Sequence, residues 1–246
     1  MLVVLIPAHN EVATIRPVVA EALTHGDKVL VIDDGSTDGT AAALDGMGVE
    51  VIRHAENIGK GGRLAEGLAH AFGQGASAAL TLDADGQHDP AEIPAFRRAA
   101  ETHPGALVLG SRARDMQAMP PVRARAIRFG DWFISWAAAT RIRDAQCGMR
   151  LIPREVWDSL AIPKRLCRGF IYETALLLYA AEAGARITPV PIAARYKGFQ
   201  QRPSHFRPIA DFLAITATVT WFLLTRGLCP RGLLVALGIV PSRNFD

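Results

Sequence analysis

Short runs of apolar residues recur through the first half of the chain, and each run ends in polar or glycine residues. The runs occupy residues 2–6, 28–32, 49–52, 78–82 and 106–109, and a helix-like stretch follows each of them. Continuous apolar strands separated by helices are typical of a parallel sheet that is covered on both faces. The pattern therefore predicts an α/β protein with a mostly parallel central sheet and helices on both faces.

The alternation of strands and helices breaks down after residue 112. Segment 113–131 has two prolines and a net positive charge, which predicts a loop followed by an amphipathic helix. Farther along the chain we expect a helix over about residues 170–183, a strand near 187–192 and a terminal helix. No linker divides the chain into two globular domains.

The C-terminal third contains a long uncharged run, residues 212–225. As a helix its 14 residues would span about 21 Å, which is short of the roughly 30 Å hydrocarbon core, so we do not expect a membrane-spanning helix. The run can form an amphipathic helix on a membrane surface, or it can pack on the core. We therefore divide the chain into a main domain, residues 1–204, and a C-terminal amphipathic, membrane-associated segment, residues 205–246.

Composition and charge exclude several classes of protein. The chain of 246 residues is 50% apolar, which is enough for a buried core, and it has no repeat or biased tract. The chain has 27 basic and 24 acidic residues, and this small excess of positive charge does not predict nucleic-acid binding. The three cysteines form no CxxC pair, which argues against a disulfide framework or a zinc site. The N-terminal sequence is not that of a signal peptide, so we expect a cytoplasmic protein.

An acidic loop after the fourth run is the strongest local signal. Asp83 and Asp85 follow a predicted strand two residues apart, and Gln87 comes two residues later. Few, hard oxygen ligands beside an open loop suit Mg²⁺ or Mn²⁺ held partly by substrate phosphates. The alternative is a turn that caps a helix, and Asp89 before Pro90 predicts such a cap.

Two further strands end in polar residues. Residues 33–40 (DDGSTDGT) follow the second run and residues 7–11 (PAHNE) follow the first. Carboxylates at such strand ends can accept hydrogen bonds from a base or a ribose hydroxyl. Alternatively, both sequences are simply good turn and capping sequences, with Thr37 or Asp38 starting a helix over 40–45.

The order of these motifs resembles a known family. PAHNE, DDGSTDGT, NIGKGG at residues 57–62, LDADGQHDP at 82–90 and GSR at 110–112 occur in the order and spacing of family 2 glycosyltransferases with the GT-A fold. The chain is most similar to the branch of dolichyl- and polyprenyl-phosphate mannosyl- and glucosyltransferases. The resemblance covers roughly residues 2–195, although His9 replaces a more usual aromatic residue and Met149 replaces Phe in the DxxxGF(R) motif.

The resemblance implies a role for individual residues and a divalent cofactor. Asp83, Asp85 and Gln87 would bind Mg²⁺ or Mn²⁺. The nucleotide-sugar donor would be bound by residues at the strand ends and by a basic loop that closes over the diphosphate. These donor-binding residues are Pro7, His9, Glu11, Asp33, Asp34, Lys60, Gly61, Asp83, Ala84, Arg112, Arg195, Arg202, His205 and Arg207.

The resemblance also implies inversion by a single in-line displacement of a nucleotide diphosphate. Such a reaction separates charge, so fixed positive charge at the leaving oxygens would lower the barrier. A lipid-phosphate acceptor is already anionic, whereas a hydroxyl of an envelope glycolipid or polysaccharide needs a base. The catalytic candidates are Asp144, then Glu173, with Arg112 at the diphosphate. Alternatively, both carboxylates form salt bridges with Arg143 or Arg150.

The acceptor and the membrane are the expected partners besides the donor. Arginines 123, 125 and 128, followed by Trp132 and Trp136, can seat a lipid phosphate at a membrane surface, or they form a solvated face. We therefore expect a peripheral protein on the cytoplasmic membrane face.

Two alternatives belong to other classes of protein. The acidic pair 33–34 imitates a phosphate-receiver domain, but no Lys-Pro occurs at a later strand end. Asp83 and Asp85 imitate the acidic pair of a haloacid-dehalogenase-like phosphatase, but that pair normally opens the chain. A glycosyltransferase accounts for more of the motifs than either alternative.

Overall fold

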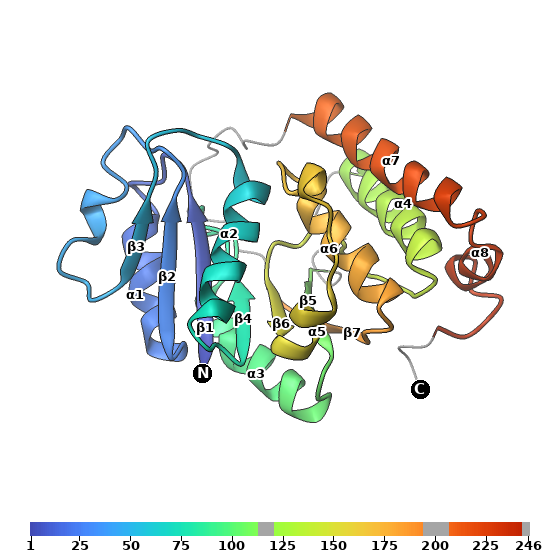
Figure 1. Cartoon of the computed structure of the whole chain (residues 1–246), viewed down its shortest axis with the longest axis horizontal. Coiled ribbons are helices and arrows are strands. Elements are labelled where there is room, and N and C mark those ends of the chain that lie inside the picture. Colours follow the sequence, from blue (N-terminus) through green and yellow to red (C-terminus); the bar gives the residue numbers. More distant parts are fainter. Residues whose placement is uncertain (113–120, 194–206, 243–246) are drawn as a thin grey trace.

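Seven strands form a single sheet in the computed structural model, which describes residues 1–112, 121–193 and 207–242 (Figure 1). Their order across the sheet is β3-β2-β1-β4-β6-β5-β7. Only β6 runs antiparallel to its neighbours in this described sheet. The strands are β1 (Leu2–Ala8), β2 (Lys28–Asp33), β3 (Glu50–Arg53), β4 (Ala78–Thr81), β5 (Leu107–Ser111), β6 (Arg150–Pro153) and β7 (Ile187–Pro191). The predicted mostly parallel sheet is confirmed.

The apolar runs form strands because they are buried on both sides. Val4, Leu5 and Ile6 in β1 and Val31 and Ile32 in β2 expose none of their surface. In β1 and β2 successive side chains point to opposite faces of the sheet, so an uninterrupted apolar run requires helices on both faces.

The sequence did not predict β6, which lies between β4 and β5. This strand has only four residues, and Arg150 and Pro153 form its ends. It exists because Leu151 and Ile152 pair with two distant strands that bury them. The predicted helix over 40–45 was also too long, because the structure has only a 3₁₀ turn, η1 (Ala42–Leu44).

Helices cover both faces of the sheet. On one face, α2 (Lys60–Gly73) packs on β1, β2 and β4 and lies beside α6 (Ile171–Glu182). On the other, α1 (Ile15–His25) packs against α3 (Ile93–Thr102). The predicted cap at Asp89 is confirmed, since its side chain accepts a hydrogen bond from the Ala91 N–H (3.0 Å) and starts η2 (Pro90–Glu92), which leads into α3. A short helix, α5 (Arg154–Ser159), follows β6.

The C-terminal helices pack against α4 (Pro121–Ala138) at one end of the molecule (Figure 1). α7 (Pro208–Thr225) contacts α4 and α6, and α8 (Pro230–Ala236) contacts α4. The inner side of α7 contributes Val219, Phe222 and Leu223 to the core, while its outer side exposes apolar residues. None of the helices in the described ranges combines the length and hydropathy needed to cross a membrane.

Candidate active site

The loops after β2, β1 and β4 meet at one edge of the sheet. These three strands are parallel neighbours, so their carboxyl ends point the same way. Ligands of open α/β sheets bind at this edge, where loops and helix N-termini converge. The fold thereby brings together the three polar motifs, which begin at residues 7, 33 and 82 of the sequence.

Hydrogen bonds join the loops after β1 and β2. The His9 ring nitrogen Nδ1 lies 2.8 Å from the Asp34 carbonyl oxygen. Asn10 has a φ of 54°, a left-handed conformation that Asn tolerates better than most residues. The buried Glu11 donates its N–H to Thr40 Oγ1 (2.8 Å). Both loops are therefore held in a defined conformation beside the site.

Asp34 anchors the start of α2. Its carboxylate accepts hydrogen bonds from the N–H groups of Ile58 (2.9 Å) and Gly59 (2.8 Å) and from Arg63 Nε (2.7 Å). Gly59 has a φ of 90°, which favours glycine at this turn. The expected donor-binding residue thus positions the loop that carries Lys60.

Asp33 offers an acceptor atom beside this anchor. Its Oδ1 accepts a hydrogen bond from the Ser36 N–H (3.0 Å). Its buried Oδ2 has no hydrogen-bond partner among the residues that the structure describes, although Arg53 Nε lies 3.6 Å away. A buried carboxylate oxygen without a hydrogen-bond partner among these residues is compatible with the expected contact to a base or ribose.

Lys60 joins the loop after β4 to α6. Its ammonium group lies 2.6 Å from Asp83 Oδ1 and 3.1 Å from Glu173 Oε1. Burial lowers the pKa of Lys60, but the two carboxylates outweigh this effect and hold it above its ordinary value. A cation is therefore fixed beside the acidic motif, although Lys60 and Glu173 are 113 positions apart.

Asp83 is ionised in this environment. Burial opposes ionisation, but Lys60 and His88 outweigh it and hold the pKa of Asp83 well below its usual range. His88 Nδ1 lies 3.4 Å from Asp83 Oδ2, and its other ring nitrogen lies 3.5 Å from Cys147 Sγ. Burial lowers the pKa of His88, whereas Cys147 and Asp83 together raise it to about 10.

Two glycines permit close approach of the backbone at this point. A Cβ on Gly148 would lie 2.3 Å from Asp83 Oδ2. A Cβ on Gly61 would lie 2.5 Å from the Gly169 carbonyl oxygen and 2.8 Å from Tyr172 Cβ. Glycine is therefore required where the loop before β6 crosses Asp83 and where α2 meets the start of α6.

The acidic motif places two carboxylates, those of Asp83 and Asp85, in the loop after β4. Burial, and after it the negative charge of Asp83, raises the pKa of Asp85. The two carboxylates repel each other, and a cation between them would relieve this repulsion. Within the described ranges no group of three or more His, Cys, Asp or Glu could hold a metal. Two carboxylates still suit Mg²⁺ or Mn²⁺, because such ions take their other ligands from phosphates and water. The Gln87 N–H donates to Asp85 Oδ1 (2.9 Å) and orients this carboxylate.

Arg112 and Asp144 form a buried, two-pronged ion pair. Arg112 Nε and Nη2 donate to the two Asp144 oxygens, each over 2.7 Å, and the Arg112 N–H donates to Oδ2 (2.8 Å). Burial raises the pKa of Asp144, but the Arg112 guanidinium outweighs it and holds this pKa below its usual value. Asp144 therefore orients Arg112. The predicted salt bridge of Asp144 with Arg143 or Arg150 is replaced here by one with Arg112.

Asp131 of α4 holds the loop that carries Asp144. Its oxygens accept the N–H groups of Asp144 and Ala145, each over 2.8 Å. Asp144 has a φ of 57°, and these bonds help to stabilise that left-handed conformation. Burial, reinforced by the charge of Asp144, raises the pKa of Asp131 to about 6.

Arg150 fixes the other end of this loop. Its buried guanidinium donates to the carbonyl oxygens of Cys147 (2.9 Å), Ala145 (2.8 Å) and Glu173. It also lies 4.0 Å from Glu173 Oε1. The predicted ion pair of Glu173 with Arg150 is thus present, but its distance of 4.0 Å is longer than the 3.1 Å between Glu173 and Lys60.

Three residues of the site, His88, Arg63 and Asp131, were not predicted from the sequence. His88 lies within the motif at residues 82–90, next to Gln87, and Arg63 directly follows the motif at residues 57–62. Asp131 had no comparable signal, because it is a single acidic residue in a predicted amphipathic helix.

For several of the predicted donor-binding residues, the structure describes no side-chain contact with the ion pairs above. Pro7 lies in β1, Ala84 is buried, and Arg207 pairs with Asp211 at the start of α7 (3.4 Å). Arg195, Arg202 and His205 lie outside the described residues.

The sequence of the chain is similar to that of known proteins. Residues 3–156 match the family described as Glycosyl transferase family 2. The chain is 29% identical over 219 residues to the UDP-N-acetylglucosamine--dolichyl-phosphate N-acetylglucosaminyltransferase of Methanococcus voltae, covering 80% of this chain and 86% of that protein. It is 27% identical over 202 residues to the polyprenol monophosphomannose synthase of Mycolicibacterium smegmatis, covering 77% and 75% of the two chains.

A solved structure shares the fold. Glucosyl-3-phosphoglycerate synthase from Mycobacterium tuberculosis, in complex with Mn²⁺, uridine diphosphate and phosphoglyceric acid, superimposes with a TM-score of 0.64 at 22% identity. The match covers 94% of this chain and 79% of that one.

Proposed function

The chain belongs to glycosyl transferase family 2, and we propose that it moves a hexose from a nucleotide-diphospho-sugar, a GDP- or UDP-sugar, to a polyprenyl phosphate. Family membership makes the protein a glycosyltransferase and leaves no support for a receiver-like or dehalogenase-like domain. The names of the relatives from Methanococcus and Mycolicibacterium support a lipid-phosphate acceptor.

The state of Asp144 is the observation that carries the choice of acceptor. Both of its oxygens are bound by Arg112, and its pKa is held below the ordinary value. A general base works best with a pKa near the working pH. Glu173, the second candidate, is ion-paired with Lys60. A hydroxyl acceptor would therefore lack a suitable base at either position, whereas a phosphate monoester is anionic at neutral pH and needs none.

Positive charge around the acidic motif supports binding of the donor diphosphate. Lys60 and Arg112 are held in place by carboxylates on neighbouring elements. Asp83 and Asp85, with Gln87 beside them, would hold Mg²⁺ or Mn²⁺, which when bound neutralises charge on the departing diphosphate. Removing one such stabilising group costs on the order of 3 kcal/mol, or about a hundredfold in rate.

The proposed reaction is a single displacement. The acceptor phosphate oxygen forms a bond to the anomeric carbon as the bond from that carbon to the diphosphate breaks, so the sugar configuration inverts. The products are a polyprenyl-phosphate sugar and a nucleoside diphosphate. The covalent step itself requires no proton transfer to a side chain.

The proposal includes a place for the reaction. A polyprenyl chain lies in the bilayer, so residues 1–204 would act as the transferase domain at the cytoplasmic membrane face. Residues 205–246 would contact the membrane. The exposed apolar side of α7 supports this division.

Transfer assays with paired acceptors test the function. The purified chain is incubated with labelled GDP-mannose, UDP-glucose or UDP-N-acetylglucosamine and Mg²⁺ or Mn²⁺, with either a polyprenyl phosphate or the matching polyprenol. We expect a labelled lipid with one donor and only with the phosphate, and NMR of the product should show an inverted anomeric centre. Transfer to polyprenol but not to its phosphate would contradict the proposal.

A further inference from the structure

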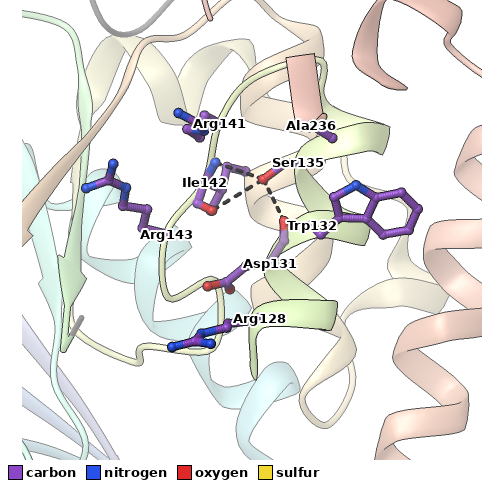
Figure 2. A pocket seen from close by; sticks show the side chains of 8 residues that line it. All are labelled: Arg128, Asp131, Trp132, Ser135, Arg141, Ile142, Arg143 and Ala236. Carbon is purple, nitrogen blue, oxygen red and sulfur yellow. Dashed lines mark hydrogen bonds between the residues drawn. The ribbon is translucent and has the colours of Figure 1, made fainter. Parts of the chain in front are cut away.

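We propose that a cavity beside α4, lined by three arginines, binds the phosphate of an anionic phospholipid headgroup at the membrane surface (Figure 2). The cavity has a volume of about 330 Å³, at the lower end of typical small-ligand pockets. This inference rests on the proposed membrane association, and it adds a site and a class of lipid. The cavity is lined by Arg128, Asp131, Trp132, Ser135, Arg141, Ile142, Arg143 and Ala236.

The charge of the cavity is positive. Arg128 comes from α4, and Arg141 and Arg143 come from the loop after it. Figure 2 shows the arginines on the opposite side of the cavity from the Trp132 indole. Asp131, the one carboxylate among the described residues that line the cavity, uses its oxygens to accept two backbone N–H groups. Exposed guanidinium groups are well suited to forked contacts with phosphate oxygens.

The cavity is built by segments far apart in the sequence. Ser135 of α4 accepts a hydrogen bond from the Ile142 N–H (2.9 Å), as Figure 2 shows. The Arg141 N–H donates to Ser242 Oγ (2.9 Å), which ties the loop to the C-terminal segment. Gly238 lies under the Arg141 guanidinium, and a Cβ there would be 3.2 Å from Nη2. The arginines are therefore placed on a defined framework.

Exposed apolar side chains lie beside this charge, and Ile239 lines a neighbouring pocket together with Arg141. Leu234, Leu237 and Ile239 of α8 and the turn after it are exposed, next to the lining residue Ala236. Phe129, beside Arg128 on α4, is 50% exposed. Positive charge beside apolar residues matches a bilayer surface, where phosphates lie above acyl chains.

α7 lies along α4 (Figure 1), and its outer side exposes further apolar residues. Ile209, Leu213, Trp221 and Leu224 are all at least 59% exposed. Hydroxyls of three threonines in α7 donate to carbonyls of their own helix, so they do not need water or a partner protein. The surface is the outside of a packed helix, which favours a fluid bilayer over a peptide that needs a groove.

The position of the cavity distinguishes this lipid from the acceptor. Asp131, which lines the cavity, binds the backbone of Asp144, whereas the Asp144 carboxylate is turned toward Arg112. Neither Arg112 nor Asp144 is among the described residues that line the cavity. A phosphate held by Arg141 would be fixed away from the reacting atoms, as suits a membrane contact.

Vesicle binding tests the inference without donor sugar or turnover, so it can fail independently of the transferase function. The full chain is sedimented with vesicles of phosphatidylcholine, alone or mixed with phosphatidylglycerol. We expect binding only to the mixed vesicles. The variant Arg128→Gln/Arg141→Gln should bind them about 25-fold more weakly, at roughly fivefold for each arginine near the surface.

Controls separate the cavity from general electrostatics. Arg98→Gln/Arg186→Gln removes the same charge from exposed positions elsewhere and should stay within about twofold of the parent chain. Arg143→Gln provides a second cavity variant, and melting temperatures check folding. Equal weakening by both double variants, or no binding of the parent chain to anionic vesicles, would overturn the inference. So would a loss seen only with polyprenyl-phosphate vesicles, because the cavity would then be the acceptor site.

Discussion

Replacing Gly148 by alanine should displace the carboxylate of Asp83. The new Cβ would lie 2.3 Å from Asp83 Oδ2 and 2.8 Å from its Cγ, closer than atoms can approach. The carboxylate must then move by about 1 Å, which disturbs its contact with Lys60, whose ammonium group lies 2.6 Å from Oδ1. A misplacement of this size costs about a hundredfold in rate. Overpacking should lower the free energy of unfolding by only about 1–3 kcal/mol.

The assay for Gly148→Ala is kcat/KM for sugar transfer, measured with saturating Mg²⁺ or Mn²⁺ and with the melting temperature in parallel. Gly73→Ala, at the end of α2, is the matched control, because a Cβ there meets no atom within 4 Å. We expect the control to keep the parent activity. A folded Gly148→Ala protein with parent kcat/KM would refute the reasoning, as would an equal loss in the control.

Three further predictions concern charged groups. Lys60→Met removes a cation held by two carboxylates and should lower kcat/KM about a hundredfold; chelation of divalent ions should abolish transfer until Mg²⁺ or Mn²⁺ is restored. Asp144→Asn should lower kcat/KM tenfold or more by loosening Arg112, and loss of the acidic limb of the pH–rate profile in this variant would instead identify Asp144 as a base. The pKa of Asp131 is raised from 3.8 to about 6, so its contribution to stability is present below about pH 4 and decreases as pH rises through about 6. Urea unfolding across this range should give a flatter pH profile for Asp131→Asn, and an unchanged slope would contradict the assignment.

Local sequence was a good guide to the parallel strands and a poor guide to β6. Strands such as β1 are apolar along their whole length, so their burial is visible in any short window. Arg150 looks like a surface residue in sequence, yet it is fully buried because three carbonyl groups from the loop before β6 and from α6 accept its hydrogen bonds. These hydrogen bonds offset the cost of burying the charge of Arg150, and the residues next to Arg150 in the sequence do not predict them.

At the site, too, local sequence indicates which residues matter, whereas the tertiary structure decides which residues they contact. The motifs were sufficient to select Asp83, Arg112 and Asp144, because their residue types and spacing are local properties of the chain. Their partners depend on how strands are ordered in the sheet, which brings Lys60 to Asp83 and Arg112 to Asp144 across 23 and 32 positions of sequence. Ion pairs form between the groups that are closest in space. Because the entropic cost of closing a loop grows only slowly with its length, sequence separation does not decide which charged residues become partners. Tertiary packing alone therefore decided that Asp144 orients an arginine and that an arginine-lined cavity lies behind it.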